Sequence, residues 1–322
     1  MTSFAKLFPL LVGLGLLPMS ARAQIYPDKP ITIVHGFDAG GGADLFLRVV
    51  APEVSKLIGQ QIVISYRTGA GGDIAIDYVS RAAPDGYTLL LATPGVVTNP
   101  FIHAGAHFDV LHDFAPVSLI GTVSNVLVTS PDFKVNSVAE LIAKAKAEPG
   151  VLNYASSGVG TSLHLDGELF KYDTGIDIVH VPYKGSMQAQ QDVVAGQDQL
   201  MFNVLPSALP MIKAGMLRAL AVTGPSRDAT LPDVPTMMEA GVANYTAVTW
   251  NGILAPAGTP RPIIDKLNAA FTQALKDPAM TAKLSAMGQG GSWSSPEEFA
   301  KFLHDEQVKW ATVIKAAGIE PR

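Results

Sequence analysis

The chain has 322 residues, 48% of them hydrophobic, and a formal net charge of −5 at pH 7. The negative balance and the lack of a basic stripe argue against a nucleic-acid partner. Cysteine is absent, which excludes a thiolate nucleophile, a disulfide framework and every cysteine-based metal site.

The first 23 residues predict a secretory signal peptide. Lys6 supplies a positive charge, residues 7–17 form an apolar core, and residues 21–23 give the A-x-A sequence that precedes cleavage. The apolar core is well short of the roughly 20 residues that a membrane-spanning helix needs. We therefore expect export, with cleavage after Ala23.

Apolar runs of strand length alternate with segments of helical period through the rest of the chain. This alternation is typical of βαβ units and a largely parallel sheet. Pro52 predicts a kink within the first helix of the first set. That set has expected strands at 31–35, 61–66 and 87–92 and expected helices at 44–58 and 74–82.

A second set of the same units starts near Val123. Ser137 and Glu140 form a predicted capping box at the start of its first helix, which ends before Pro149. This set has expected strands at 151–155, 176–181, 200–204 and 217–222, and its second helix is expected at 161–172.

The chain then returns to the first set through an expected strand at 249–254. The final segment is predicted to be helical: Thr259 offers an N-cap, and Ser295 with Glu298 offers a capping box. No linker rich in proline, serine or charge separates the two sets. Such a chain is expected to form two lobes with a cleft between them.

The fold class is therefore predicted to be α/β, with two lobes joined by crossover strands. Each lobe is expected to be a mixed sheet flanked by helices. Domain I would comprise residues 24–123 and 249–322, and domain II would comprise residues 124–248.

The loop after the first strand is the strongest local signal for a binding site. Gly40, Gly41 and Gly42 let the backbone approach a ligand, and the following helix points its positive end at the same place. Such a junction can hold a carboxylate or phosphate. The simpler interpretation is that the glycines only allow a tight turn between the strand and the helix. Asp44 is expected at the N-cap or in the first turn, where it satisfies free amides.

The same pattern recurs at residues 69–72 and 156–160, so that each lobe has a glycine-rich strand-to-helix junction. In open α/β sheets, ligands bind outside the carboxyl ends of the strands. Loops on opposite lobes would clamp a small molecule. Lys184 could pair with its anionic group or solvate the loop rim, and Asn203 is a candidate polar contact because a buried amide needs partners.

Nucleotide binding and hydrolysis lack their motifs. No segment has the Lys-Ser/Thr of a Walker A loop, and Ile74 stands where a dinucleotide fingerprint starting at Gly69 needs glycine. Ser156, His164 and Asp166 could be imagined as a triad, yet the chain has no G-x-S-x-G elbow. A helical histidine such as His164 is more commonly structural.

Three histidines, His103, His107 and His112, have a spacing that could hold a metal. Only Asp109 or Asp113 could complete such a site, which favours surface histidines instead. We therefore expect no metal, no cofactor and no catalytic residue.

Motifs along nearly the whole chain after the signal peptide resemble one known family, the extracytoplasmic solute receptors of tripartite tricarboxylate transporters, often called Bug-type or Bordetella uptake proteins. These motifs are YPDKPI at 26–31, GAGG at 69–72, PDGYTLL at 84–90, NYAS at 153–156, HVPYKG at 180–185, DVPT at 233–236, Trp250, and APAGTP at 255–260.

The resemblance implies a periplasmic, monomeric receptor of the type II-like binding-protein fold, which is not an enzyme. Its lobes would close over a small organic acid and deliver it to a permease with one large and one small subunit. The alternatives are a receptor that signals to a membrane sensor kinase and a hydrolase that acts on a carboxylate ester. The candidate ligand contacts are Phe37, Asp38, Gly40, Gly41, Gly42, Asp44, Thr93, Ser156, Gly160, Thr161, His164, Lys184 and Asn203.

The first loop departs from the family, which usually has prolines where this chain has HGFDA at 35–39. Losing prolines raises the entropy cost of ordering the loop. Asp38 adds a carboxylate near the expected ligand carboxylate, which is unfavourable. Asp38 would therefore face solvent or accept a hydrogen bond from a ligand hydroxyl, amine or ring N–H, while Phe37 could stack on an aromatic acid or pack under the loop.

Overall fold

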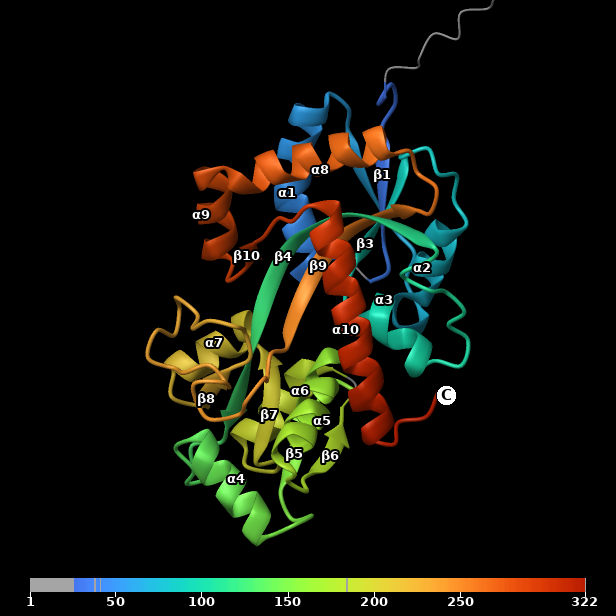
Figure 1. The fold of residues 1–322 in the computed structure, drawn as a ribbon. Coiled ribbons are helices and arrows are strands. Elements are labelled where there is room, and N and C mark those ends of the chain that lie inside the picture. Colours follow the sequence, from blue (N-terminus) through green and yellow to red (C-terminus); the bar gives the residue numbers. More distant parts are fainter. Residues whose placement is uncertain (1–25, 38, 41, 184, 322) are drawn as a thin grey trace, which may run out of the picture.

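The computed structural model describes residues 26–37, 39–40, 42–183 and 185–321, so the predicted signal peptide lies outside it. Two lobes lie one above the other in Figure 1 and are joined by the long strands β4 (Phe114–Thr129) and β9 (Val248–Pro256). The predicted α/β fold with two lobes and mixed sheets is confirmed. No helix within the described ranges is long and apolar enough to cross a membrane.

The first lobe is built on three parallel strands in the order β2-β1-β3, with β9 antiparallel to β3. Helices α1 and α8 pack together over a buried cluster in which Phe46 and Phe271 are fully buried. Burying each of these rings contributes about 2–3 kcal/mol. The elements of this lobe are β1 (Ile31–His35), α1 (Gly42–Ile58), β2 (Ile62–Tyr66), η1 (Ala70–Gly72), α2 (Asp73–Ser80), β3 (Thr88–Ala92), α3 (Gly95–Thr98), η2 (Asn99–Phe101), α8 (Arg261–Lys276), α9 (Pro278–Ala286) and β10 (Gly290–Gly291).

The second lobe has the parallel order β7-β5-β6, with β4 antiparallel to β7 and β8. Its fully buried residues include Phe170 and Phe202, whose rings meet edge to face at 5.9 Å. The elements of this lobe are α4 (Val138–Ala147), β5 (Asn153–Ser156), α5 (Ser162–Thr174), β6 (Val179–Pro182), α6 (Ser186–Val194), β7 (Leu200–Val204), α7 (Leu205–Lys213) and β8 (Arg218–Val222).

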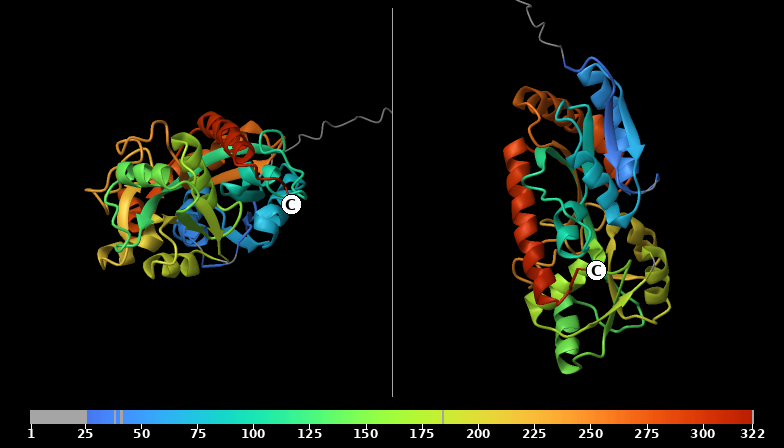
Figure 2. Two further views of the ribbon diagram at one scale, coloured as in Figure 1. Left: turned by 90° about the horizontal axis from the view of Figure 1, so that it is seen from below. Right: turned by 90° about the vertical axis from the view of Figure 1, so that its right-hand side faces the viewer.

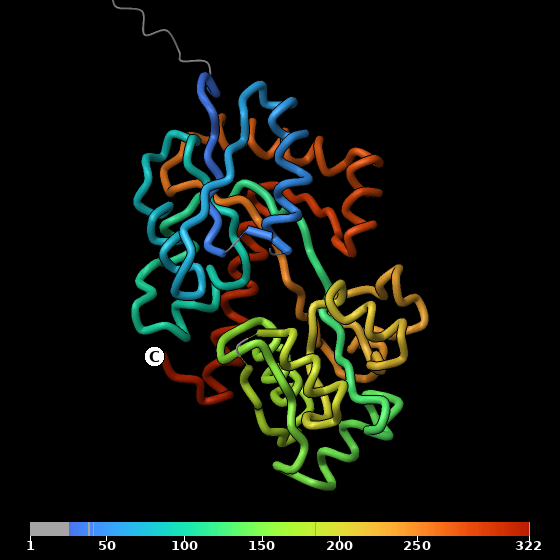
Figure 3. The backbone as a smooth tube through the Cα atoms, turned by 180° about the vertical axis from the view of Figure 1, so that it is seen from behind, coloured from blue at the N-terminus to red at the C-terminus, as the bar shows by residue number. Residues whose placement is uncertain are grey.

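Strand β4 belongs to both lobes, as the tube in Figure 3 shows. Residues 114–124 pair with β9, and residues 125–129 pair with β7 and β8. The pairing therefore switches between Ser124 and Asn125, beside the predicted domain boundary, which stays a prediction. A largely parallel sheet is found only within each set of three strands, because the crossover strands run antiparallel to their neighbours.

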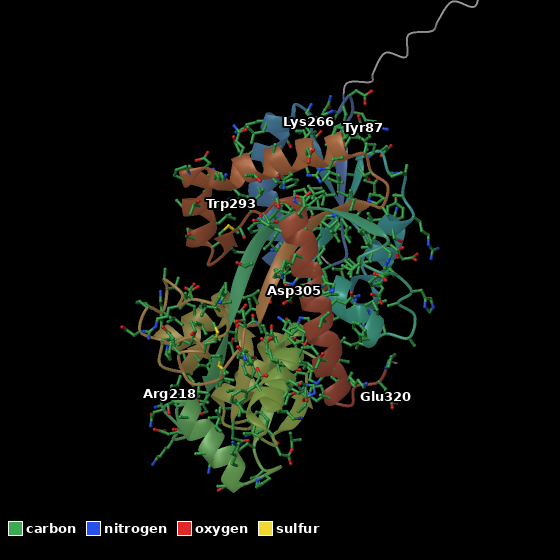
Figure 4. The ribbon with its side chains drawn as sticks, in the orientation of Figure 1. Tyr87, Arg218, Lys266, Trp293, Asp305 and Glu320 are labelled. Carbon is green, nitrogen blue, oxygen red and sulfur yellow. The ribbon has the colours of Figure 1, made fainter. Side chains whose placement is uncertain are left out.

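Helix α10 (Pro296–Ala316) also spans both lobes, and Figure 2 shows it running along the length of the molecule. Near its start Phe302 meets Trp250 of β9 edge to face at 5.5 Å. Asp305, labelled in Figure 4, lies on the exposed side of this helix. Its Oδ2 forms an ion pair with Lys301 Nζ, one turn earlier, at 2.5 Å. Its buried side carries Trp310 into the cluster that contains Phe170 of the second lobe.

Three predicted helix starts meet different outcomes. Ser295 and Glu298 form the full capping box. Ser137 accepts from the Glu140 amide, but Glu140 Oε2 accepts from the Asn136 amide rather than from Ser137, so that box is only half formed.

The prediction that Thr259 caps a helix is wrong. The Thr259 hydroxyl donates to the Pro256 carbonyl at 2.7 Å, and α8 starts at Arg261 after Pro260. Helix α1 continues through Pro52 as one element. Helices α3, α6 and α7 were not predicted. Helix α9 falls within the final segment that was predicted to be helical.

Candidate functional site

A cavity of about 430 Å³ lies between the lobes, within the range of small-molecule sites. Its walls come from the ends of β1, β3 and β5, from the helices that follow them, and from β9 and α10. The lining residues are His35, Phe37, Gly42, Ala43, Gly71, Thr93, Pro94, Gly95, Thr98, Asn99, His103, Val159, Gly160, Thr161, Ser162, Leu165, Asp166, Val248, Thr249 and Trp310.

In the first lobe, the loop after β1 is held by the carboxylate of Asp44. Asp44 Oδ2 accepts from the Gly40 amide at 2.7 Å and from Arg48 Nε at 2.9 Å, and its Oδ1 accepts from Tyr66 Oη at 2.6 Å. Burial acts to raise the pKa of Asp44, but these hydrogen bonds outweigh it and lower that pKa. Asp44 is therefore an ionised support behind the loop and is not among the lining residues.

The start of α1 faces the cavity through Gly42 and Ala43. The amides of the first helical turn have no carbonyl partner within the helix, and the helix dipole makes this end positive. Gly40 is not among the lining residues, whereas the predicted contacts Phe37 and Thr93 are. The predicted contacts Asp38, Gly41 and Lys184 fall outside the described residues.

In the second lobe, the loop after β5 leads into the start of α5. Thr161 is the N-cap, and its side chain accepts from the His164 amide at 3.4 Å. The Gly160 amide donates to His164 Nδ1 at 3.0 Å, so it is used inside the loop rather than offered to a ligand. Ser162, at the first helical position, lines the cavity and leaves its amide without a helical partner.

A stack of three rings supports this loop from behind. His164 and His180 are stacked with centroids 3.9 Å apart, and Tyr154 lies on His180 at 4.9 Å. Burial lowers the pKa of His164 to about 4, and burial followed by the proximity of His164 lowers the pKa of His180 to about 4. Both rings are therefore neutral at pH 7, which lets His164 Nδ1 accept from Gly160.

Ser156 and His164 do not form the imagined triad. Ser156 Oγ lies 2.6 Å from His180 Nε2, and its side chain is fully buried. Neither Ser156 nor His164 is among the lining residues, so both hold the loop in place. Asn203 is also buried away from the lining, where its Nδ2 donates to Gln190 Oε1 at 2.6 Å.

The third glycine-rich junction is tied to η2 by Asp73. Asp73 Oδ1 accepts from Asn99 Nδ2 at 2.6 Å, and its Oδ2 pairs with His103 Nδ1 at 2.8 Å. Gly71 has a φ of 62°, and a Cβ there would stand 2.6 Å from His103 Cε1. His103 was predicted to be a surface histidine, but it lines the cavity.

The three spaced histidines do not gather around one point. His112 is exposed and pairs with Asp109 at 2.8 Å, and His107 is exposed. Among the residues that the structure describes, no group of three or more potential ligands could hold a metal ion.

Seven polar lining residues were not selected as ligand contacts by sequence reasoning, and two of them, His35 and Asp166, are almost fully buried ionisable groups. His35 is 1% exposed, its Nδ1 has no hydrogen-bond partner, and burial lowers its pKa although nearby Asp44 opposes the shift. Asp166 is also 1% exposed and accepts from Asn125 Nδ2 at 2.7 Å. Each residue had one signal in the sequence: His35 is a polar residue at the end of a strand, and Asp166 is a polar residue on the apolar face of a helix.

No lysine or arginine lines the cavity in the described part of the chain. Most of the lining is apolar or small, including Phe37, Leu165, Val248 and Trp310. The arrangement can therefore hold a molecule with an apolar body whose negative group is met by helix starts and hydroxyls. It holds no nucleophile beside a base among these lining residues.

A family model described as the tripartite tricarboxylate transporter family receptor matches residues 46–319. The protein BugT of Bordetella pertussis is 35% identical over 320 residues, which cover 99% of this chain and 98% of BugT.

Solved structures give the same picture. An R. palustris protein, Rpa4515, solved with adipate is 38% identical with a TM-score of 0.78, covering 92% of this chain and 100% of that one. The periplasmic binding protein BugD is 32% identical with a TM-score of 0.75, over 92% and 100%. MatC from Rhodopseudomonas palustris, with bound malate, is 30% identical with a TM-score of 0.73, over 90% and 100%.

Proposed function

The chain belongs to the tripartite tricarboxylate transporter receptor family, and from this premise we propose that it is a periplasmic receptor for a small organic acid. The acid is held in the cavity between the lobes and passed to the permease subunits of such a transporter. The protein itself performs no chemistry on the acid.

One observation carries this proposal: the starts of α1 and α5, one from each lobe, line the same cavity. Each offers first-turn amides and the positive end of a helix dipole. Two such ends around one cavity without a described cationic side chain favour an anion that is small and held by neutral donors. A carboxylate fits this description.

The apolar walls define the rest of the ligand. Phe37, Leu165 and Trp310 come from three different elements and surround the cavity. They suit the hydrocarbon body of an acid. Adipate in Rpa4515 and malate in MatC are acids of this kind in two similar proteins.

Thermal unfolding of the exported chain with adipate, malate and benzoate tests the proposal, with adipamide as the uncharged control. A ligand at about 100 times its Kd adds about 2.7 kcal/mol of stability, which raises Tm by several degrees. We expect at least one acid to give this rise and adipamide to give none. No rise with any acid, or conversion of an acid during incubation, would contradict the proposal.

Uptake tests the transport step separately. Cells that contain the permease subunits are supplied with the labelled acid, with and without this chain. We expect uptake only when both are present. Equal uptake without the chain would instead favour a role in signalling to a membrane sensor.

A further inference from the structure

Asp166 is a buried acid in the cavity wall of the second lobe. It lies on α5 one turn after Ser162, which puts both side chains on the same face of that helix. Only 1% of its surface is exposed. Asp166 therefore lines the cavity in which the proposed acid would bind.

The surroundings of Asp166 fix its position. Its Oδ2 accepts from Asn125 Nδ2 at 2.7 Å, and its backbone carbonyl accepts from Tyr245 Oη at 2.9 Å. Asn125 in turn accepts from the Thr249 hydroxyl at 3.5 Å through its own Oδ1, so its amide nitrogen is directed to Asp166. No hydrogen bond to Oδ1 of Asp166 comes from the described residues, which leaves that oxygen as an acceptor.

No cation is paired with Asp166 in the described part of the chain. The charged groups that act on it are Glu306 and Lys309 of α10, and these two side chains bond to each other. Burial, opposed by Asn125 and Lys309, raises the pKa of Asp166 to about 7. A bound carboxylate would raise the cost of ionising Asp166 further, since like charges repel.

A ligand that offers a hydrogen-bond donor removes this conflict. We propose that Asp166 determines specificity by accepting a hydrogen bond from a hydroxyl or amino group of the bound acid. The receptor then prefers hydroxy- and amino-carboxylates to unsubstituted acids of the same length. The inference rests on the proposed function, because it names the class of acid that the same cavity takes.

Matched acids that differ by one group test the inference at pH 8, above the pKa of about 7 that Asp166 has without a ligand: succinate, malate and aspartate, and phenylacetate with mandelate. A hydrogen bond to a charged acceptor corresponds to about tenfold to hundredfold in affinity. Calorimetry on the exported chain should show this preference for the substituted member of at least one set. Equal or tighter binding of every unsubstituted acid would overturn the inference.

Two variants localise the effect. Asp166→Ala should bring the members of each set to within about threefold of one another, since the acceptor is gone. Asp166→Asn has nearly the same volume and must keep its oxygen for Asn125, so it turns an NH₂ donor to the cavity. It should weaken malate and aspartate and strengthen succinate, and it keeps the test open if the alanine variant does not fold.

Asp173→Ala is the control, because Asp173 is an exposed acid on the same helix away from the lining. It should leave every preference unchanged. A preference that survives both Asp166 variants would overturn the inference while leaving the proposed function intact. Failure of every acid to bind the wild-type chain would instead count against the proposed function.

Discussion

Two strand–loop–helix junctions face each other across the cavity, and they are stabilised by different chemistry. After β1, an ionised Asp44 collects the Gly40 amide, Arg48 and Tyr66. After β5, neutral groups stabilise the loop: the Thr161 side chain caps α5, and His164 Nδ1 accepts a hydrogen bond from the Gly160 amide.

This difference determines how each of the two loops responds to a change in pH. The lowered pKa of Asp44 keeps its support charged down to acidic pH. The support in the second lobe requires a neutral His164, which can no longer accept at Nδ1 once it is protonated. The two halves of one clamp should therefore differ in their sensitivity to acid.

The largest expected effect comes from Gly160, where the second loop touches the first lobe. Its φ is 79°, and a Cβ would stand 2.8 Å from Cγ2 of buried Ile102. The backbone strain lowers stability, whereas overpacking against Ile102 opposes the approach of the two lobes around the acid. Overpacking costs about 1–3 kcal/mol, so Gly160→Ala should weaken binding of the acid by about tenfold to 100-fold. Calorimetry measures the loss.

Gly196→Ala is the matched control for that variant. Gly196 has a φ of 76°, and a Cβ there meets nothing within 4 Å. It should cost about 1 kcal/mol of stability and leave affinity unchanged. Equal affinity of the two variants would mean that the contact between Gly160 and Ile102 does not matter for binding.

Removing the ionised side chain of Asp44 should cost more stability than removing the neutral side chain of Thr161. Asp44→Ala removes the acceptor of a half-buried hydroxyl, an amide and a guanidinium, and we expect a loss of about 2–3 kcal/mol in the free energy of unfolding. Urea denaturation measures it. Asp44→Asn, which keeps one oxygen, should lose less, and a cost below that of Thr161→Ala would reverse the comparison.

Acid should act mainly on the second lobe. His164 has a folded pKa near 4, below its ordinary value of 6.5, so its contribution to stability is present above pH 6.5 and is lost as pH falls toward 4. Between pH 7 and pH 4.5 this loss amounts to about 2 kcal/mol, and binding should weaken with it. Denaturation of the wild-type chain and of His164→Gln across this range should show the smaller dependence in the variant.

Exposed His112 provides the control for the acid experiment. His112→Gln should follow the wild-type pH profile. A His164→Gln profile that also coincides with the wild type would show that the histidine stack does not confer the acid sensitivity.

The smallest expected effect is the loss of the cap on α5. Thr161→Ala should reduce stability by about 1 kcal/mol, as for other N-cap residues. Because the cap also orients the lining residue Ser162, affinity should fall by a few-fold in calorimetry. Thr161→Ser, which keeps the hydroxyl, should restore both values, and no restoration would mean that the threonine methyl packing matters instead.

Sequence reasoning predicted the junctions themselves because their signals are local. Glycines after a strand and before an apolar-periodic helix identify the loops at 36–42 and 156–160 without any knowledge of the rest of the chain. The helical position of Asp44 and the placement of Gly42, Gly160 and Thr161 at the cavity follow from the same signals. The α/β fold with two lobes followed from the alternation of elements.

Side-chain roles within those junctions were less predictable. Ser156 and His164 stand at the expected places in the chain, yet they turn away from the cavity to support the loop. Asn203 ends a strand as expected, but it bonds to Gln190 within its own lobe. The direction of each side chain depends on which neighbour packs behind the loop, and spacing does not contain that information.

By itself, the sequence determined the order of the strands and long helices, the glycine-rich junctions and the family. Tertiary structure alone decided that His35, His103, Asp166 and Trp310 line one cavity with those junctions. These residues come from β1, the segment after η2, α5 and α10, which are distant in the chain. Only the crossover of β4 and β9 and the passage of α10 along both lobes bring them together, because burial of apolar surface shared by the two lobes is a property of the whole fold.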